Sequence, residues 1–462
     1  RRTVERLDTL GKMDFTVPTS LKATLRGYQI DGYQWLGSLE HLGLGGILAD
    51  DMGLGKTLQM IALILARVEA GDTKPTLVVC PASLVYNWAA ELERFAPSLD
   101  VCAIVGAKAQ RRVQIAGVAE HNVVVTSYDL MRRDIDEYIE QDFARVVLDE
   151  AQYIKNPLTQ VARAAKRLPA SVRFALTGTP IENRLSELWS IFDFLMPGLL
   201  GTRDSFAKRF ESPVEHAEGD SAARLQALVS PFVLRRVKED VVADLPEKIE
   251  DTVMAQLTGE QRKLYLANQD RIAQQVQHRE AGEFKKDKLK VLAELTKLRQ
   301  ICCDPHLHYA DYKAGSAKLD TCMELVRGAL DGGHRILLFS QFTGMLDIIG
   351  KRLAKEDIAF LKLTGASSKE SRAKMVAQFQ AGEVPVFLIS LKAGGVGLNL
   401  TAADVVIHYD PWWNVAAQDQ ATDRAHRIGQ QHTVTVYKLI AKDTIEAVSY
   451  THLRAHETSL HL

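Results

Sequence analysis

The chain has 462 residues, of which 46% are hydrophobic and 25% are charged, and its formal net charge is −1. This composition is typical of globular proteins and argues against a disordered chain, while the length allows two or three domains. A near-neutral charge gives no support to nucleic-acid binding through a broad basic surface. Any such binding would instead depend on backbone N–H groups and hydroxyls, which hold phosphates without a net positive charge.

The cysteines and the apolar segments favour a reducing compartment and a chain without a membrane span. The five cysteines are irregularly spaced and contain no Cys-x-x-Cys pair, which argues against both a disulfide framework and a zinc site. No apolar run approaches the roughly 20 residues that a spanning helix requires, and no signal peptide is evident. We expect a cytoplasmic, nucleoid-associated protein in a prokaryote or a nuclear one in a eukaryote, and the initial Arg1 indicates that an upstream part is missing.

Short apolar runs rich in β-branched residues recur along the chain, and each is followed by turn residues and a helical stretch. In the first half these runs are residues 46–49, 77–80, 123–126, 146–148 and 174–176. In the second half the same pattern restarts at residues 336–339, 361–363, 386–389, 405–408 and 434–437. Alternation of this kind predicts an α/β fold with two doubly wound parallel-sheet lobes.

Between these halves, from about residue 182 to 313, strand signals nearly vanish. Leu188, Ile191, Phe192 and Leu195 recur with helical spacing, so we predict a helical insert. Its basic stretch, residues 285–290, could contact phosphate, although a charge run on a helix is more often a solvated face.

Residues 50–57 follow a predicted strand and open a predicted helix, which is the setting of a phosphate-binding loop. Gly53 and Gly55 let backbone N–H groups approach phosphates, Lys56 can reach the terminal oxygens, and the Thr57 hydroxyl can hold Mg²⁺. The strict pattern has glycine at the first position, where this chain has Asp50. Alone, such a loop can also be a turn without chemical consequence.

A pair of acidic residues strengthens the prediction of a nucleotide-hydrolysing site. Asp149 and Glu150 end an apolar strand, as a magnesium-binding carboxylate and a water-activating carboxylate require. Acidic strand ends are often only loop residues, but their combination with the Lys56–Thr57 loop makes the catalytic interpretation much the stronger one.

Two further segments complete the predicted hydrolytic site. Residues 176–180 end the last strand of the first lobe with hydroxyls and a tight turn. In the second lobe, Arg424 and Arg427 are three residues apart, so on a helix they would share a face and could stabilise charge on a transferring phosphoryl group. An isolated pair with this spacing is also common on a salt-bridged surface.

Together, these motifs resemble the Swi/Snf family of superfamily-two, helicase-like DNA translocases, from Leu21 to Glu446. The most specific stretches are residues 46–59, 176–183, 231–236, 298–303, 390–399 and 423–430. The resemblance implies two RecA-like lobes with a helical insert, and ATP and Mg²⁺ as cofactors. It implies catalytic roles for Lys56, Asp149, Glu150, Arg424 and Arg427, and magnesium binding by Thr57 and Asp149. It also implies that Gln29 contacts the adenine edge. The full set of implied nucleotide-binding residues is Arg26, Gln29, Asp51, Met52, Gly53, Leu54, Gly55, Lys56, Thr57 and Leu58.

The resemblance also implies contacts with the DNA backbone through hydroxyls and glycine N–H groups. The residues concerned are Trp88, Thr126, Ser127, Gln341, Thr343, Thr364, Lys392, Gly394, Gly395 and Trp413. Trp413 matches an aromatic position that meets DNA in the family, but a buried core tryptophan is nearly as good an interpretation. Gln152 stands where the family often has His, and Val415 where it often has Pro.

The resemblance implies ATP-dependent translocation on double-stranded DNA that remodels or displaces DNA-bound proteins, by a monomer of the compact bacterial or archaeal type. A strand-separating helicase and a factor that recycles RNA polymerase remain alternatives, and a catalytically dead scaffold is disfavoured because the catalytic residues are present. We expect a leader at 1–20, a first lobe with a helical protrusion at 21–245, a helical linker at 246–312, a second lobe at 313–446 and a non-native tail at 447–462.

Overall fold

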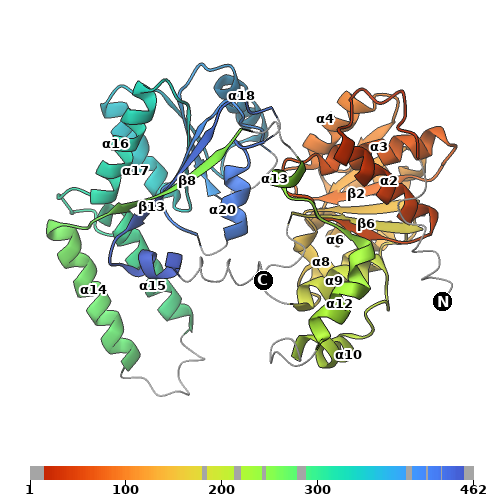
Figure 1. The fold of residues 1–462 in the computed structure, drawn as a ribbon, viewed down its shortest axis with the longest axis horizontal. Coiled ribbons are helices and arrows are strands. Elements are labelled where there is room, and N and C mark those ends of the chain that lie inside the picture. The colour runs from red at the N-terminus through yellow and green to blue at the C-terminus, as the bar shows by residue number, and fades with distance from the viewer. Residues whose placement is uncertain are drawn as a thin grey trace. The chain divides into compact units, whose positions relative to one another are not determined.

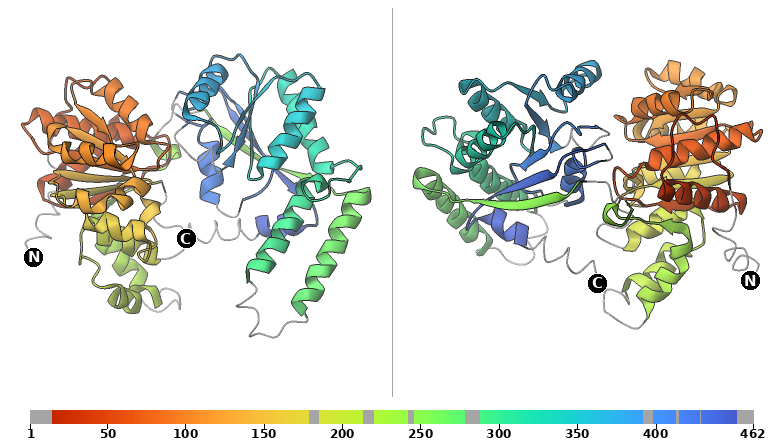
Figure 2. Two further views of the ribbon diagram at one scale, coloured as in Figure 1. Left: turned by 180° about the vertical axis from the view of Figure 1, so that it is seen from behind. Right: turned by 45° about the horizontal axis from the view of Figure 1, so that its top comes forward.

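The computed structural model describes residues 15–178, 185–212, 220–241, 246–277, 288–391, 398–412, 415–427 and 429–451. Packing divides the chain into two compact units, residues 1–243 and 244–462. Each unit contains one parallel sheet with helices on both faces, as Figures 1 and 2 show. The predicted pair of parallel-sheet α/β lobes is therefore confirmed.

The sheet of the first unit has seven parallel strands in the order β3-β4-β2-β5-β6-β1-β7. Its central strands are runs of Val, Leu and Ile that are buried on both faces, because helices cover the sheet on each side. The strands are β1 (Gly46–Leu48), β2 (Thr76–Cys80), β3 (Val101–Ala103), β4 (Val123–Ser127), β5 (Arg145–Asp149), β6 (Val172–Leu176) and β7 (Val233–Leu234).

Short polar side chains cap three of the described helices of the first unit. Ser127, Thr159 and Thr202 each accept a hydrogen bond from the third backbone N–H of α6, α8 and α10. The apolar positions predicted for a helix near residue 190 all lie buried in α9. The helices are α2 (Gly27–His41), α3 (Lys56–Glu69), α4 (Val85–Phe95), α5 (Lys108–Ala116), α6 (Tyr128–Arg133), α7 (Ile135–Tyr138), α8 (Gln160–Arg167), α9 (Leu185–Leu195), α10 (Arg203–Phe206), α12 (Ser221–Val229) and α13 (Lys238–Val241).

The sheet of the second unit has six parallel strands in the order β10-β11-β9-β12-β13-β8. Neighbouring strand residues face opposite sides, so Leu338 joins the apolar cluster beneath α16 and α17, whereas Leu337 joins the cluster on the other face. The strands are β8 (Lys248–Ala255), β9 (Ile336–Ser340), β10 (Phe360–Leu363), β11 (Val386–Ser390), β12 (Val405–His408) and β13 (Val434–Ala441). The helices are α14 (Gly259–Gln277), α15 (Lys288–Cys303), α16 (Ala317–Asp331), α17 (Thr343–Lys355), α18 (Lys369–Gln380) and α20 (Val415–Thr422).

The stretch predicted to be almost purely helical contains two strands, β7 and β8, and this part of the prediction is wrong. Both are edge strands, and β8 pairs with β13 along its whole length. An edge strand needs no continuous apolar run, and the first half of β8 is charged and exposed, so its sequence gives little strand signal. The basic stretch at 285–290 lies outside the described residues, except that α15 begins at Lys288.

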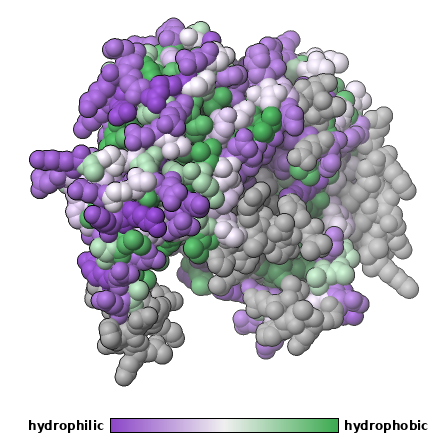
Figure 3. Space-filling model, turned by 60° about the vertical axis from the view of Figure 1, so that its left-hand side comes forward, coloured by the Kyte–Doolittle hydropathy of each residue, from purple (hydrophilic) through white to green (hydrophobic). Residues whose placement is uncertain are grey.

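Within the residues that the structure describes, no helix has both the length and the apolar character to cross a bilayer. On the face drawn in Figure 3, hydrophobic residues lie scattered among hydrophilic ones. Singly exposed apolar side chains are ordinary in globular proteins.

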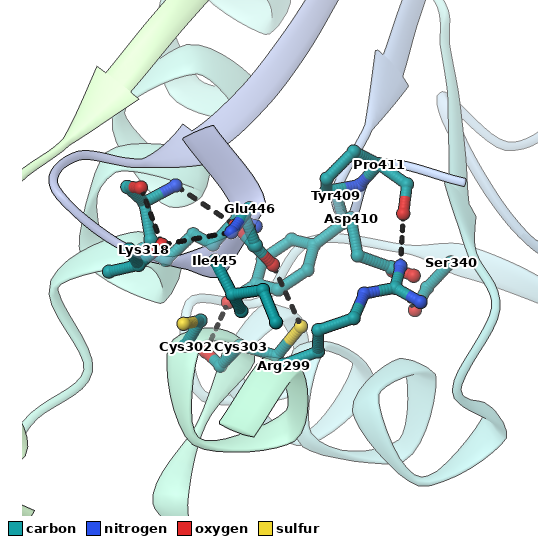
Figure 4. A network of polar contacts seen from close by, with 12 residues as sticks. Arg299, Cys302, Cys303, Lys318, Ser340, Tyr409, Asp410, Pro411, Ile445 and Glu446 are labelled. Carbon is teal, nitrogen blue, oxygen red and sulfur yellow. Dashed lines mark hydrogen bonds and ion pairs between the residues drawn. The ribbon is translucent and has the colours of Figure 1, made fainter. Parts of the chain in front are cut away.

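A buried ion pair joins α16 to the segment that follows β13 (Figure 4). Lys318 Nζ lies 2.6 Å from Glu446 Oε2, and neither side chain is exposed to solvent. The same carboxylate oxygen accepts from the backbone N–H of Ala441 at 2.9 Å, and the ammonium lies 5.4 Å from the ring centroid of Tyr409. Burial by itself lowers the pKa of Lys318, but the Glu446 carboxylate, together with Cys303 and Asp410, outweighs that effect, so the pKa is raised.

Replacing Lys318 by Met should strongly destabilise the second unit, because the Glu446 carboxylate would remain buried without its partner. Loss of one member of a buried pair costs about 3–5 kcal/mol of unfolding free energy. Urea denaturation followed by circular dichroism measures the change. Lys362→Met is the matched control, because Lys362 pairs with Asp347 on the exposed surface and such pairs contribute about 0–1 kcal/mol. Equal losses in the two variants would contradict the prediction.

Candidate functional site

The loop between β1 and α3 has the backbone geometry of a phosphate-binding loop. Gly53 and Gly55 have φ angles of +89° and +79°, a region that side chains other than glycine rarely adopt. α3 begins at Lys56, and Gly55 has no side chain with which to cap the first backbone N–H groups of this helix. Those N–H groups form a positive helix end next to the loop, which suits an anionic ligand.

The Lys56 side chain, at the start of α3, lies near several carboxylates. Its ammonium donates to the backbone carbonyls of Asp50 and Asp51, at 2.5 and 3.3 Å. Burial lowers the pKa of Lys56, while the carboxylates of Glu150, Asp50 and Asp149 oppose that shift. The loop lysine and the acidic strand end that the sequence suggested are thus brought together.

Asp149 ends β5 and is held by hydrogen bonds on both carboxylate oxygens. The Trp88 indole donates to Oδ2 at 2.8 Å, and the backbone N–H of Glu150 donates to Oδ1 at 3.0 Å. Burial, followed by the charge of Glu150, raises the pKa of Asp149 to about 7, although Trp88 and Lys56 favour its ionised form. A divalent cation would relieve the repulsion between these adjacent carboxylates, so the residues fit Mg²⁺.

Glu150 has a φ angle of +53°, a left-handed conformation that is strained for a residue with a side chain. Its carboxylate Oε2 accepts from Gln152 Nε2 at 2.7 Å, and Gln152 Oε1 accepts from the Thr177 hydroxyl at 3.0 Å. Gln152 therefore bridges the acidic strand end of β5 and the first residue after β6. Residues 179–180 of the predicted hydroxyl-rich turn lie outside the described residues.

The residues predicted to bind adenine contact the loop from α2. Gln29 is buried and donates from Nε2 to the Leu54 carbonyl at 3.0 Å, while its Oε1 accepts from the backbone N–H of Arg26 at 2.9 Å. The Tyr28 hydroxyl donates to the same Leu54 carbonyl at 3.1 Å. The beginning of α2 is thus fastened to the phosphate loop, and base recognition by Gln29 stays a prediction.

One residue of this site was not assigned from the sequence. Arg236, which follows β7, donates from Nε to Asp50 Oδ1 at 2.8 Å and from Nη2 to Gln59 Oε1 at 2.8 Å. Asp50 is fully buried, so its departure from the glycine of the strict loop pattern has a structural reason. The stretch 231–236 was among the specific motifs. However, Arg236 and its partner Asp50 are 186 residues apart, and no pattern in a single sequence indicates that they pair.

The candidate DNA contacts of the first unit are engaged within the protein. Trp88 is 1% exposed, and its indole supports Asp149. The buried Thr126 hydroxyl donates to the Ile104 carbonyl at 3.3 Å, and Ser127 caps α6. The buried position of Trp88 does not support a contact between its side chain and DNA, and that contact stays a prediction.

In the second unit, the candidate DNA contacts gather at the carboxyl ends of parallel strands. Gln341 follows β9, Thr343 begins α17 and is exposed, and the partly exposed Thr364 follows β10. Arg299 of α15 donates to the Pro411 carbonyl (Figure 4). It also donates to Gln341 Oε1 at 3.4 Å. Lys392, Gly394, Gly395 and Trp413 lie outside the described residues.

The predicted helix bearing Arg424 and Arg427 is wrong, because α20 ends at Thr422 and both arginines lie in a turn. The Arg424 carbonyl accepts from the backbone N–H of Leu400 at 3.0 Å, whereas in a continued helix it would accept from residue 428. Arg424 is buried and Arg427 is partly exposed. Their spacing therefore does not place them on one helical face.

The bridge through Gln152 yields a prediction for the expected hydrolysis of ATP. Gln152→Ala should lower kcat by roughly tenfold or more, because Glu150 loses a hydrogen bond to its charged group. ATP affinity should stay nearly unchanged, since the side-chain hydrogen bonds described for Gln152 go to Glu150 and Thr177 rather than to the loop. Steady-state hydrolysis and nucleotide titration measure the two effects. Gln160→Ala, which removes an exposed partner of Arg132, is the control, and wild-type kcat in Gln152→Ala would refute the role.

Comparison with known proteins agrees with this geometry. An SNF2-related domain matches residues 28–307, and a helicase conserved C-terminal domain matches residues 317–429. A putative ATP-dependent helicase/translocase of Bacillus subtilis is 42% identical over 93% of this chain and 48% of its own length. A TATA-binding protein-associated factor of Schizosaccharomyces pombe is 36% identical over 96% of this chain and 27% of its own. The chain thus spans less than half the length of these relatives.

Among solved structures, the SWI2/SNF2 ATPase core of Sulfolobus solfataricus in complex with double-stranded DNA is similar. It has 38% sequence identity and a TM-score of 0.52, and the match covers 97% of this chain and 94% of that one. Membership of this family explains why one chain contains the phosphate loop, the acidic strand end and two parallel sheets. The chain belongs to the SNF2 family and is an ATP-hydrolysing enzyme.

Proposed function

We propose that this enzyme uses ATP hydrolysis to translocate along double-stranded DNA and to remodel or displace proteins bound there. The observation that carries the proposal is the convergence of Lys56, Asp149 and Glu150, with Gln152 linking Glu150 to Thr177. The relative from S. solfataricus was solved with double-stranded DNA, and the S. pombe relative is named for association with a DNA-binding protein. These names support DNA and DNA-bound proteins as partners, and RNA polymerase is one candidate among such proteins.

The nucleotide would bind at the loop, with backbone N–H groups of residues 53–58 and the Lys56 ammonium on its phosphates. Gln29 and Arg26 would contact the adenine. The Thr57 hydroxyl and the Asp149 carboxylate would hold Mg²⁺, which neutralises charge on the phosphates. Glu150 would accept a proton from the attacking water, and its hydrogen bond to Gln152 orients its carboxylate for that task.

Arg424 and Arg427 of the second unit would stabilise the charge that develops on the transferring phosphoryl group. Guanidinium groups suit this role because they are planar, permanently charged donors. Hydrolysis would then require residues of both units, and its rate would depend on how the protein binds DNA. Contacts to DNA through hydroxyls and backbone N–H groups would hold phosphates without reading sequence, consistent with a net charge of −1.

Duplex DNA should stimulate ATP hydrolysis more than single-stranded DNA or RNA. The expectation rests on the similarity to an ATPase core solved with double-stranded DNA. Steady-state hydrolysis with each nucleic acid, compared across salt concentrations, measures it, and stimulation should weaken with salt because phosphate contacts release counterions. Equal or stronger stimulation by RNA would reject a duplex translocase.

Translocation without strand separation should displace the third strand of a DNA triplex but leave a forked duplex intact. The test separates the proposal from the alternative of a strand-separating helicase, which the name of the B. subtilis relative also includes. Fluorescence-labelled triplex and forked substrates report both activities with the same ATP supply. ATP-dependent release of a strand from the fork would favour the helicase.

Arg427→Ala should lower kcat by about 10³-fold while nucleotide affinity changes only a few-fold, because an arginine finger acts on charge formed in the transition state. Lys56→Ala should weaken nucleotide binding as well, since that ammonium contacts ground-state phosphates. Hydrolysis with saturating duplex and a labelled-nucleotide titration compare the variants. Near wild-type hydrolysis by Arg427→Ala would show that the second unit contributes no catalytic arginine at this position.

A further inference from the structure

The chain that connects the two units is fastened at its first end to the phosphate loop. The backbone N–H of Ala49 donates to the Leu234 carbonyl at 2.7 Å, and that of Asp51 donates to the Arg236 carbonyl at 3.0 Å. The backbone N–H of Lys238, where α13 begins, donates to Asp51 Oδ2 at 3.2 Å. The last described segment of the first unit before the connection therefore lines the loop itself.

The Arg236 side chain makes this attachment specific. Its guanidinium binds both carboxylate oxygens of Asp50, at 2.8 and 2.5 Å, and Asp50 is fully buried. It also donates to the Tyr28 carbonyl and to Gln59 Oε1, so it joins the loop to α2 and α3. A Cβ at Gly32 would lie 1.9 Å from Gln59 Oε1, which shows how closely α2 packs on this network.

The other end of the connection is hydrogen-bonded to residues 424–427 of the second unit, which we call the arginine turn. His426 lies between Arg424 and Arg427, is mostly buried, and makes a 2.8 Å hydrogen bond from Nε2 to the Pro246 carbonyl. Because a carbonyl only accepts, Nε2 carries the proton. The backbone N–H of Val434 donates to the Glu247 carbonyl at 3.0 Å, immediately before β8 begins.

We propose that Arg236 and His426 are positioning residues that tie the two ends of the connecting chain to the phosphate loop and to the arginine turn. The proposal rests on the proposed function, in which both units serve one hydrolysis reaction. From Lys238 to Pro246 the connection reaches at most roughly 30 Å even when fully extended. In the proposal, so short a link, anchored in each unit beside a proposed catalytic segment, couples the two segments by limiting how far apart they can move.

A double-mutant cycle tests this dependence. Arg236→Lys keeps a positive charge beside Asp50 but loses the two-pronged contact, and His426→Leu removes the hydrogen bond to Pro246. Each substitution should lower kcat by about tenfold, the value of one hydrogen bond to a charged or buried group. If both anchors serve one link, the double variant should lose about as much as the more affected single variant.

The same cycle includes readouts that a purely structural role would not change. Arg236→Lys should also weaken nucleotide binding, whereas His426→Leu should lower kcat at nearly unchanged nucleotide affinity. His426→Gln, which retains a donor near the Nε2 position, should recover most of the lost rate. Thermal unfolding of every variant controls for loss of folded protein. Arg327→Lys and His334→Leu are matched controls, because both residues form exposed ion pairs elsewhere.

The outcomes are distinct from those that test the proposed function. If the reductions in kcat caused by the two single substitutions multiply in the double variant, as they do for independent sites, the proposed coupling is overturned. Failure of His426→Gln to recover activity would overturn the role of the hydrogen bond to Pro246. If Arg427→Ala retained wild-type hydrolysis, the proposed function would fail. If Arg427→Ala lost hydrolysis while the cycle was multiplicative, only the coupling would fail.

Discussion

Parallel strand pairing is the constraint on which the functional site depends. Every ladder in both sheets is parallel among the described strands, so the carboxyl ends of neighbouring strands lie at one edge. The loop after β1, the carboxylates after β5 and Thr177 after β6 meet at this edge, although long stretches of sequence separate them. The crevice beyond the carboxyl ends of such strands is the usual ligand position in open α/β sheets.

Charge balance at that edge sets the chemistry. Lys56 lies partly buried among carboxylates, and Asp149 lies beside Glu150 with its pKa raised to about 7. Removing the Lys56 ammonium or the carboxylates from water is unfavourable for each charge alone. Each opposite charge therefore lowers the free energy needed to keep the other ionised. The two carboxylates have different hydrogen-bond partners: Trp88 donates to Asp149, whereas Gln152 donates to Glu150 and accepts from Thr177.

The second unit supports its candidate segments by a different means, a buried polar network. Lys318 and Glu446 hold α16 against the segment that follows β13, and Arg299 of α15 binds the Pro411 carbonyl beyond β12 (Figure 4). Such networks tolerate little change, because each removed partner leaves a buried polar group unsatisfied. The helices α15 and α16 thereby set the position of the turn after β12, which precedes the candidate DNA residue Trp413.

The sequence by itself determined the fold class, the buried strands and the chemical identity of the phosphate loop and acidic strand end, because these depend on local periodicity and local motifs. It missed the edge strands β3, β7 and β8, because β3 and β7 have only three and two residues and the first half of β8 is exposed and mostly charged. It also wrongly predicted a helix for Arg424 and Arg427. Only the tertiary structure decided that Asp50 pairs with Arg236 and that Trp88 supports Asp149. These contacts join residues far apart in the chain, and their energies depend on burial, which arises only when the units pack.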